Sequence, residues 1–187
     1  MISAISFIGA CRIRSSAGDV AVQDATSADL RTGLGVVAAR HIAGEALCRT
    51  GSGSVRIDRI DGRAEVRNSN GDTRIGETGG PLRVKSANGS ITVGRARTDV
   101  TATTANGNLS IGRAEGGAVE LKTSLGRIEI GIPSGTSALL DLSTSFGTVR
   151  NELDSVAGPA AGEGTVEVHA QTSAGDIDIV RVEIAEA

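Results

Sequence analysis

The 187-residue sequence contains no tryptophan, no tyrosine and only 2 phenylalanines. Aromatic side chains supply much of the buried area of an ordinary globular core, so the interior must here be built from Val, Ile, Leu and Ala. No apolar run reaches the roughly 18 residues of a membrane-spanning helix. The first residues, MISAISFIGA, lack the basic region and the apolar length of a signal peptide. We therefore expect a cytoplasmic protein, or a cell-surface one if an upstream segment is missing.

The sequence also lacks an excess of either charge. Its 19 Lys and Arg residues are interspersed with 22 Asp and Glu residues, which gives a net charge of −3. A nucleic-acid-binding domain usually carries a strongly basic footprint, so no specific nucleic-acid partner is expected.

Glycine is abundant, with 26 residues, and it marks an internal repeat. Three similar phrases, NSNGDTRIG, SANGSITVG and TANGNLSIG, start 18 residues apart at Asn68, Ser86 and Thr104. Such self-similarity at a fixed period is the signature of a repeat architecture. The glycine of each of these turns, here called the anchor glycine, recurs along the whole chain at Gly18, Gly35, Gly53, Gly71, Gly89, Gly107, Gly126, Gly147 and Gly175.

Apolar residues alternate on both sides of every anchor. The positions seven and five residues before it are apolar in all repeats, for example Leu82 and Val84. The positions two and four residues after it are also apolar, except for Thr73 and Asn151. Alternation by two on each side of a turn predicts two short, half-buried strands per repeat. A second glycine nine residues after the anchor (Gly44, Gly62, Gly80, Gly116) marks the other corner, where we expect a positive φ.

Two all-β architectures fit this pattern. An antiparallel meander would use each Asn-Gly as a hairpin turn. A parallel β-helix, or β-solenoid, would stack each repeat on the next, so that equivalent side chains form columns. Short polar residues three positions before the anchors, such as Thr104 and Thr123, would point inward at the corner, and Asn70, Asn88 and Asn106 would form an Asn ladder. These columns favour the β-solenoid, right-handed by the general crossover rule, with about nine to ten coils of 18 residues.

The ends of the chain follow the same pattern. Ile2, Ala4, Phe7 and Gly9 match the second half of a repeat, so the single domain over residues 1–187 starts in mid-coil, as though an upstream portion were absent. Near the other end, residues 151–165 (NELDSVAGPAAGEGT) account for the long spacing between the last two anchors. They predict a surface loop inserted before the final coil.

With the repeat laid out, the sequence resembles a bacterial adhesin-like domain family of unknown function. The resemblance rests on NSNGDTRIGE, ANGSITV, TANGNLSIG, LDLSTSFGTVRNEL and TSAGDIDI, and it covers essentially the whole chain. It implies a β-solenoid of bacterial origin, and it implies no catalytic residue.

No catalytic, cofactor or metal site is expected. Cys11 and Cys48 fall on inward positions two repeats apart, roughly 10 Å, which exceeds disulfide reach and predicts free core thiols. His41 and His169 belong to distant coils and lack further ligands. A sugar-cleaving enzyme needs two carboxylates close together. Asp19, Asp72 and Asp176 lie in separate coils, whereas Asp58 and Asp61 near Arg59 and Arg63 indicate a solvated charge cluster.

The exposed feature with the clearest functional meaning is a column of cations four residues before the anchors. These positions point outward, and stacking would align them on one face, with relief from Asp29, Glu65 and Glu120 two residues earlier. The column, here called the basic stripe, comprises Arg14, Arg31, Arg49, Arg67, Lys85 and Lys122, with Thr103 as a gap. It is either a solvated face that resists aggregation or a track for an anionic polymer or an acidic protein surface.

We therefore expect a non-enzymatic, adhesin-like binding or scaffold module. The alternative is a self-assembling polymeric scaffold, because stacked coils with open ends can associate end to end. An enzyme acting on envelope polysaccharides is the third hypothesis.

Overall fold

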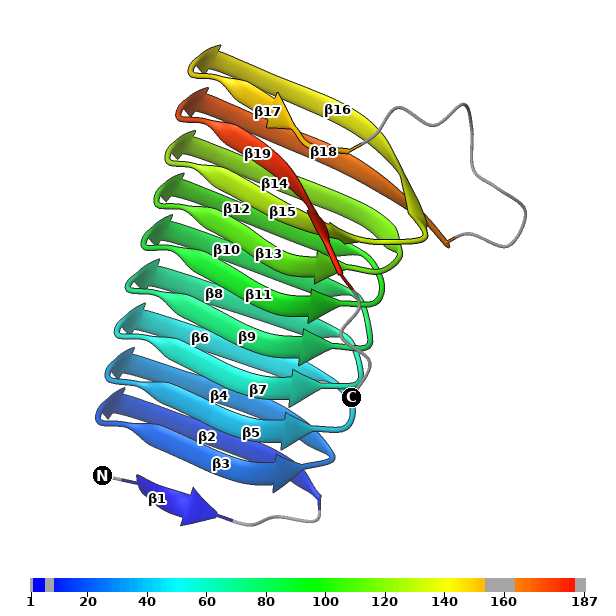
Figure 1. Ribbon diagram of the computed structural model, residues 1–187. Helices are drawn as coiled ribbons and strands as arrows, with labels where there is room; N and C mark the ends of the chain where they lie inside the picture. The colour runs from blue at the N-terminus through cyan, green and yellow to red at the C-terminus, as the bar shows by residue number, and fades with distance from the viewer. Residues whose placement is uncertain (1, 6–8, 154–163, 184–187) are drawn as a thin grey trace.

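The computed structural model describes residues 2–5, 9–153 and 164–183. None of these residues lies in a helix. Their strands form two parallel sheets that face each other, and the chain passes from one sheet to the other at each turn (Figure 1). The predicted all-β solenoid is therefore confirmed.

Each coil contributes one strand to each sheet. The odd-strand sheet contains β1 (Ile2–Ile5), β3 (Val20–Ala25), β5 (Val37–Ile42), β7 (Val55–Ile60), β9 (Thr73–Thr78), β11 (Ile91–Ala96), β13 (Leu109–Ala114), β15 (Ile128–Pro133), β17 (Val149–Asn151) and β19 (Ile177–Val182). The even-strand sheet contains β2 (Ala10–Ala17), β4 (Ser27–Leu34), β6 (Ala46–Ser52), β8 (Ala64–Asn70), β10 (Leu82–Asn88), β12 (Val100–Asn106), β14 (Gly117–Leu125), β16 (Thr136–Phe146) and β18 (Gly164–Ala174).

Neighbouring strands pair in parallel, and the register follows the sequence period. Val84 of β10 lies between Val66 of β8 and Ala102 of β12, each 18 residues away in the sequence. A meander would give antiparallel pairs between consecutive strands, so the alternative architecture is wrong. At the start of the chain Ile2 of β1 pairs with Val20 of β3. Phe7 lies outside the described residues.

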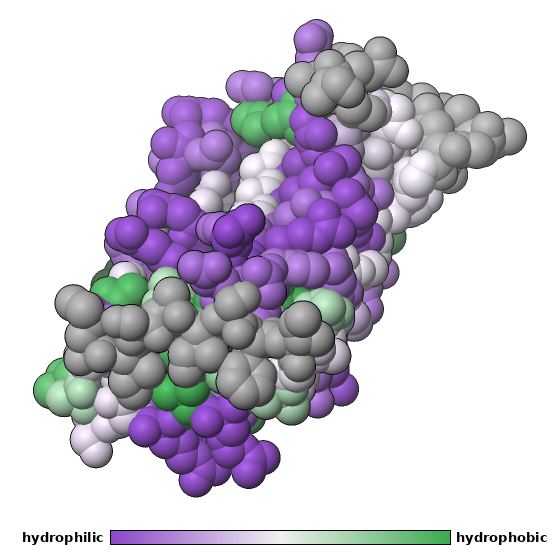
Figure 2. Space-filling model, turned by 90° about the horizontal axis from the view of Figure 1, so that it is seen from below, coloured by the Kyte–Doolittle hydropathy of each residue, from purple (hydrophilic) through white to green (hydrophobic). Residues whose placement is uncertain are grey.

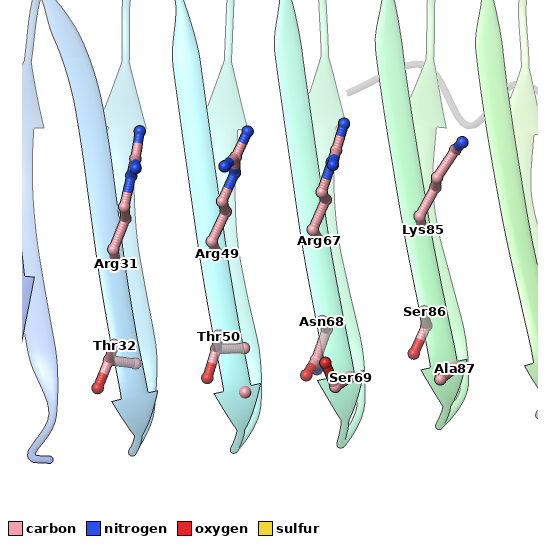
Figure 3. A pocket seen from close by; sticks show the side chains of 11 residues that line it. Arg31, Thr32, Arg49, Thr50, Arg67, Asn68, Ser69, Lys85, Ser86 and Ala87 are labelled. Atoms are coloured by element: carbon pink, nitrogen blue, oxygen red, sulfur yellow. The ribbon is translucent and has the colours of Figure 1, made fainter. Parts of the chain in front are cut away.

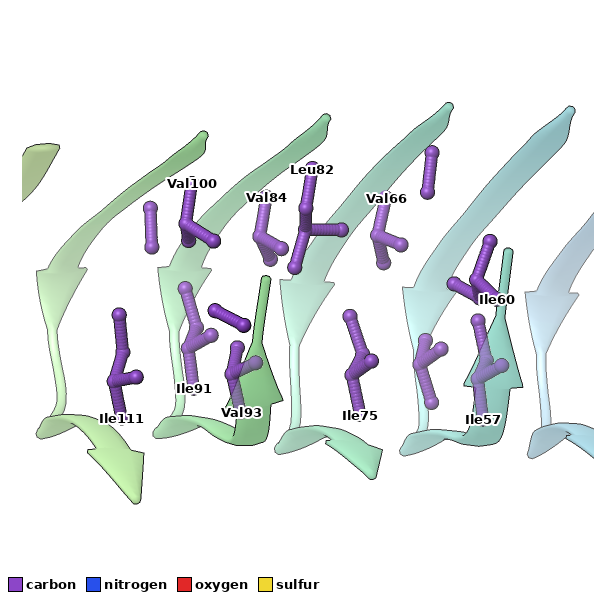
Figure 4. Close-up of a cluster of buried hydrophobic side chains, with 14 of the residues drawn as sticks. Ile57, Ile60, Val66, Ile75, Leu82, Val84, Ile91, Val93, Val100 and Ile111 are labelled. Carbon is purple, nitrogen blue, oxygen red and sulfur yellow. The ribbon is translucent and has the colours of Figure 1, made fainter. Parts of the chain in front are cut away.

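The core lies between the two sheets and is aliphatic. Ile57, Ile75, Val84 and Ile91 are essentially inaccessible, and Figure 4 shows such side chains from both sheets meeting in the interior. Among the residues whose burial the structure describes, the predicted inward apolar positions are buried except in the outermost coils. There Ile13, Leu140 and Leu142 are only partly buried, and Val149 and Asn151 are exposed.

The anchor turns require glycine for two reasons. Gly89 has a φ of +132°, and a Cβ at this position would lie 2.2 Å from the carbonyl oxygen of Gly71 in the coil below. The second corner differs from the prediction, because Gly62 and Gly80 do not have a positive φ. A Cβ on Gly62 would instead lie 2.5 Å from the backbone of Gly44. Close stacking of successive coils, rather than backbone conformation, selects glycine there.

The predicted polar columns are present at the anchor corner. The Thr123 hydroxyl donates to the carbonyl oxygen of Gly107, the anchor of the preceding coil, at 3.1 Å. The amide of Asn106 donates to Asn88, and Asn88 donates to Asn70, each at 2.9 Å. The side chains therefore satisfy turn carbonyl groups and tie successive coils together.

The order of the last coils in space differs from their order in the chain. The strand order is β15–β19–β17 in one sheet and β14–β18–β16 in the other, so the β18/β19 coil lies between two coils that precede it in sequence (Figure 1). The corner hydrogen bonds follow this spatial order. Thr172 donates to Gly126, and Thr144 donates to Gly175, in each case the coil directly beneath. The expected sequential stacking is therefore wrong at this end, although every pair remains parallel.

The turn from β15 to β16 passes over the coil of β18 and β19, and Arg181 of β19 binds to it. Its Nη1 donates to the carbonyl oxygens of Pro133 and Thr136, both at 3.0 Å. The predicted loop over residues 151–165 is also shorter than expected at both ends. Asn151 belongs to β17, whereas Gly164 and Thr165 belong to β18. Residues 154–163 lie outside the described part of the chain.

Candidate anion-binding face

The basic stripe lies on the outer face of the even-strand sheet, in direct register. Arg14 pairs with Arg31, Arg31 with Arg49, Arg49 with Arg67, and Arg67 with Lys85. Figure 3 shows Arg31, Arg49, Arg67 and Lys85 side by side on successive strands, with their charged ends pointing the same way. Lys122 stands apart, because Thr103 occupies the intervening position. The sequence period thus places five cations in adjacent coils. The sixth cation, Lys122, follows in the coil after Thr103.

Three of the six cations are paired with the carboxylates predicted for them. Arg31 binds Asp29 with both Nε and Nη2, at 2.8 and 3.2 Å. Nε of Arg67 lies 2.6 Å from Glu65, and Nζ of Lys122 lies 2.5 Å from Glu120. The hydrogen bond from Lys122 lowers the pKa of Glu120. Each partner stands two residues earlier on the same strand, where alternation returns the side chain to the same face.

The other three cations of the stripe have no ion pair with any residue that the structure describes. These are Arg14, Arg49 and Lys85. Arg49 is also notable because its Nε is buried from solvent and has no hydrogen-bond partner. A buried N–H of a charged group is normally satisfied, so this unpaired donor is an exception.

A column of small residues runs beside the stripe, two residues before each anchor. It comprises Ser16, Gly33, Gly51, Ser69, Ala87, Ala105, Ser124, Ser173 and Ser145 in spatial order. The stripe and this column together border a groove of about 510 Å³ that runs across four coils, from Arg31 to Lys85 (Figure 3). The small residues leave room beside the long cationic side chains. The sequence analysis missed this column, although its period was visible.

The groove wall contains two further unsatisfied polar atoms. The Oδ1 atom of Asn68 and the hydroxyl of Ser86 are both buried without a hydrogen-bond partner. Asn68 uses its amide nitrogen on the carbonyl oxygens of Gly53 and Gly71, at 3.0 and 2.8 Å, and so keeps its oxygen free. The described residues that line the groove include no carboxylate and no histidine. The lining therefore offers mainly positive charge and donors.

The chain matches the model of one known protein family. The model of the Toastrack family, DUF4097, matches residues 8–180. The chain belongs to the Toastrack family. This is a domain family of unknown function, so the match supports the uncharacterised family expected from the sequence but not an adhesive activity. No curated protein and no solved structure matches the chain.

The two histidines of this Toastrack chain are not brought together. His41 lies in β5 of the odd-strand sheet, where its Nε2 is 2.8 Å from Asp61. His169 lies in β18 of the even-strand sheet, between Asp141 and Glu167 at 3.1 and 3.0 Å. No group of His, Cys, Asp and Glu within the described ranges is arranged to hold a metal ion. A shared histidine site is therefore excluded by the fold.

The carboxylates considered for catalysis have structural partners. Asp19, Asp72 and Asp176 each accept a backbone N–H from the next coil, at 2.8 to 2.9 Å. Asp61 binds His41 and Arg59, and these hydrogen bonds lower its pKa. Asp61 is thus part of the predicted solvated charge cluster.

That cluster is one end of an ion-pair ladder along the second corner, which the sequence analysis missed. Arg59 lies 3.5 Å from Glu77, and Arg97 lies 2.6 Å from the same carboxylate. Glu115 then contacts Arg97 and Arg95, at 3.8 and 2.6 Å. The partners are 18 or 20 residues apart in sequence, so the repeat period was the only signal that could have found them.

Cys11 and Cys48 are free and buried, as predicted. Cys11 lies in β2 and Cys48 in β6, with β4 between them. Burial, together with the nearby Asp29, raises the pKa of Cys48 to about 12, and burial also raises that of Cys11. Neither thiol has the lowered pKa of a reactive cysteine.

In the view from below, hydrophilic side chains cover most of the surface that belongs to described residues, with small separate apolar areas between them (Figure 2). Among the described residues no helix is long and apolar enough to cross a membrane.

Proposed function

We propose that this solenoid is a non-enzymatic binding module that holds an anionic polymer along its basic stripe. The proposal depends on one observation, the in-register column of Arg14, Arg31, Arg49, Arg67 and Lys85. A linear array of cations on a rigid sheet is complementary to a linear array of anions. The groove beside it gives such a chain a place to lie.

The electrostatics of the stripe favour a ligand. Neighbouring cations about 4.8 Å apart repel by roughly 1 kcal/mol even in bulk water. Carboxylate partners offset this for Arg31, Arg67 and Lys122, but not for Arg14, Arg49 and Lys85. A bound polyanion would reduce the remaining repulsion among these cations.

The surface is better suited to a polyanion backbone than to nucleic-acid bases. Single-stranded nucleic acids are usually bound by stacking on aromatic rings. The chain has no tryptophan or tyrosine, and Phe146, the phenylalanine that the structure describes, is not among the residues that line the groove.

The test is thermal unfolding in the presence of heparin at low ionic strength. A ligand that prefers the folded state raises the melting temperature by mass action, and the gain should fade as salt shortens the Debye length to about 8 Å. Replacing Arg49, Arg67 and Lys85 with Gln should abolish the gain. The matched control replaces Arg40, Arg56 and Arg74 of the odd-strand sheet, which are exposed cations, and should keep it. A melting temperature independent of heparin at low salt would make the stripe a solvated face.

A second candidate function is self-association through the β16/β17 end. These strands are the last members of both sheets, and Phe146 and Val149 of this coil are 79% and 42% exposed. Edge strands with exposed apolar side chains favour pairing with another chain. Sedimentation velocity on the wild type and on Phe146→Ser would test it. A concentration-independent monomer would remove this candidate.

A further inference from the structure

We infer that the polymer bound by the stripe carries its anionic groups at intervals of two coils, as an acidic polysaccharide with one acid group per disaccharide would. This inference rests on the proposed function and specifies its ligand. It follows from the ion pairing of the stripe, because cations with a carboxylate partner alternate with cations that have none.

Ion pairing alternates along the stripe from coil to coil. Arg31 and Arg67 are held by Asp29 and Glu65, two residues earlier on the same strands. At the equivalent position Arg49 is preceded by Leu47 and Lys85 by Arg83. Neither Arg49 nor Lys85 has an ion pair within the described ranges, and Arg14 also has none. The uncompensated cations are therefore those of the first, third and fifth coils.

This alternation sets a spacing. Adjacent strands lie about 4.8 Å apart, so cations two coils apart are separated by roughly 9–10 Å. A cation paired with a carboxylate presents little net charge to a ligand, especially in salt. The face therefore attracts anions at Arg14, Arg49 and Lys85 and is close to neutral at the two coils between them.

The spacing distinguishes among linear polyanions. An extended polypeptide places side chains on one side every 6.6–6.8 Å, which does not match two coils. Polyphosphate has a charge on every monomer, much closer together than the coils. An extended pyranose chain advances by about one coil spacing per sugar, so acid groups on alternate sugars meet successive uncompensated cations.

The groove between these cations has polar groups for the uncharged sugars. Ser69 is exposed among the residues that line the groove. Sugar hydroxyls both donate and accept hydrogen bonds, and they can pair with the Ser69 hydroxyl.

The test compares two double variants with the same charge change. Hyaluronan, with one carboxylate per disaccharide, is titrated at low salt by isothermal calorimetry against the full chain. Arg49→Gln with Lys85→Gln should weaken binding by about tenfold or more, the equivalent of roughly 1.4 kcal/mol. Arg31→Gln with Arg67→Gln removes two cations from the same stripe and should weaken it by less than about threefold. Circular dichroism melts check that both variants fold.

A gain-of-function variant tests the spacing directly. Asp29→Asn with Glu65→Gln releases Arg31 and Arg67, so that cations then occur at every coil. This variant should gain affinity for polygalacturonate, which has a carboxylate on every sugar, more than for hyaluronan.

The outcomes separate the two proposals. Equal losses from the two double variants, or wild-type binding that is tightest for polyphosphate, would overturn the two-coil spacing while the anion-binding function stands. No binding of hyaluronan, polygalacturonate, polyphosphate or heparin to the wild type would overturn the proposed function itself.

Discussion

The carboxylate of Asp178 accepts a hydrogen bond from Nε of Arg127 at 2.7 Å and thereby joins the inserted coil to the coil below it. Asp178 lies in β19, and its side chain is 7% exposed. Arg150 of β17 approaches the other carboxylate oxygen from the opposite side, at 3.8 Å. The bond to Asp178 raises the pKa of Arg127, which stays charged. One carboxylate thus contacts both coils that enclose its own.

Removing Arg127 should destabilise the C-terminal coils. Arg127→Gln leaves a buried carboxylate with only the longer contact to Arg150. Breaking a fully buried ion pair costs roughly 3–5 kcal/mol, but Arg127 is half exposed, so we expect about 1–3 kcal/mol. Urea unfolding measures this loss against Arg74→Gln, an exposed cation that should change the unfolding free energy by less than about 0.5 kcal/mol. Equal effects would mean that Asp178 does not hold the coil in place.

Charged residues on the inward and outward positions should have opposite consequences. Val93→Asp or Ile111→Asp buries an unpaired carboxylate between the sheets and should cost more than about 4 kcal/mol. Thr92→Asp places the same charge on the outer face next to Arg74 and should be mild. Circular dichroism melts measure both effects. Similar melting temperatures for both changes would contradict the register of β11.

The anchor glycines should tolerate no side chain. Gly89→Ala forces a Cβ to within 2.2 Å of the Gly71 carbonyl oxygen at a φ of +132°, and we expect a loss on the order of 3 kcal/mol or more. Gly135 also has a positive φ, of +77°, but no atom lies within 4 Å of its added Cβ. Gly135→Ala should therefore cost only the backbone strain, about 1–2 kcal/mol. Denaturant titration compares the two, and a cost at Gly135 that matches Gly89 would rule out coil stacking as the cause.

The two thiols should remain free and protected. Burial raises the pKa of Cys48 to about 12, so little thiolate exists at pH 8. A maleimide reagent should label Cys48 only after denaturation, and mass spectrometry after exposure to air should show no disulfide. A Cys11–Cys48 bond would be incompatible with a strand between β2 and β6.

His169 should make stability depend on pH near neutrality. Hydrogen bonds to Glu167 and Asp141 raise the pKa of His169, while Glu120 of β14 faces it in register. A raised folded-state pKa stabilises the protein fully below the unfolded value of about 6.5, and this contribution is lost as pH rises through the folded value. Urea unfolding at a series of pH values from 6 upward measures how the free energy of unfolding declines with pH.

His169→Gln provides the control for this pH dependence. It removes the titrating group from β18, so the decline above the unfolded histidine pKa should flatten. An unchanged slope in the variant would assign the dependence to other groups.

The sequence was sufficient to predict the coil, but not the order of the coils. Alternation around Gly89 predicts which of Ile91, Thr92 and Val93 face inward, because the side-chain period of a strand is fixed. The corner threonines and the Asn ladder follow from the same period. The strands β16 and β18 both have this pattern, so the pattern alone does not predict which of them pairs with β14. Only polar Asn151 at an inward position hinted that its coil lies at an end, where that position is exposed.

The sequence predicted where the candidate site lies, but it did not predict how every side chain of the site packs. The spacing placed the six cations in one column and named Asp29, Glu65 and Glu120 as partners. The buried Nε of Arg49 could not be predicted, because it depends on how the long side chain packs against its neighbours. The handedness of the solenoid stays a prediction from the crossover rule.

The position of β18 and β19 has a consequence for how the protein is synthesised. The chain emerges from the ribosome with its N-terminal residues first, and each of the early coils can add to the one already formed. The coil of β16 and β17 is made before the coil on which it rests. Until β18 and β19 have been translated, that coil lacks the neighbour below it, and β15 is paired only with β13. Translation of β18 and β19 therefore completes the pairing of two coils at once, and a chain truncated before them keeps unpaired strands in both coils.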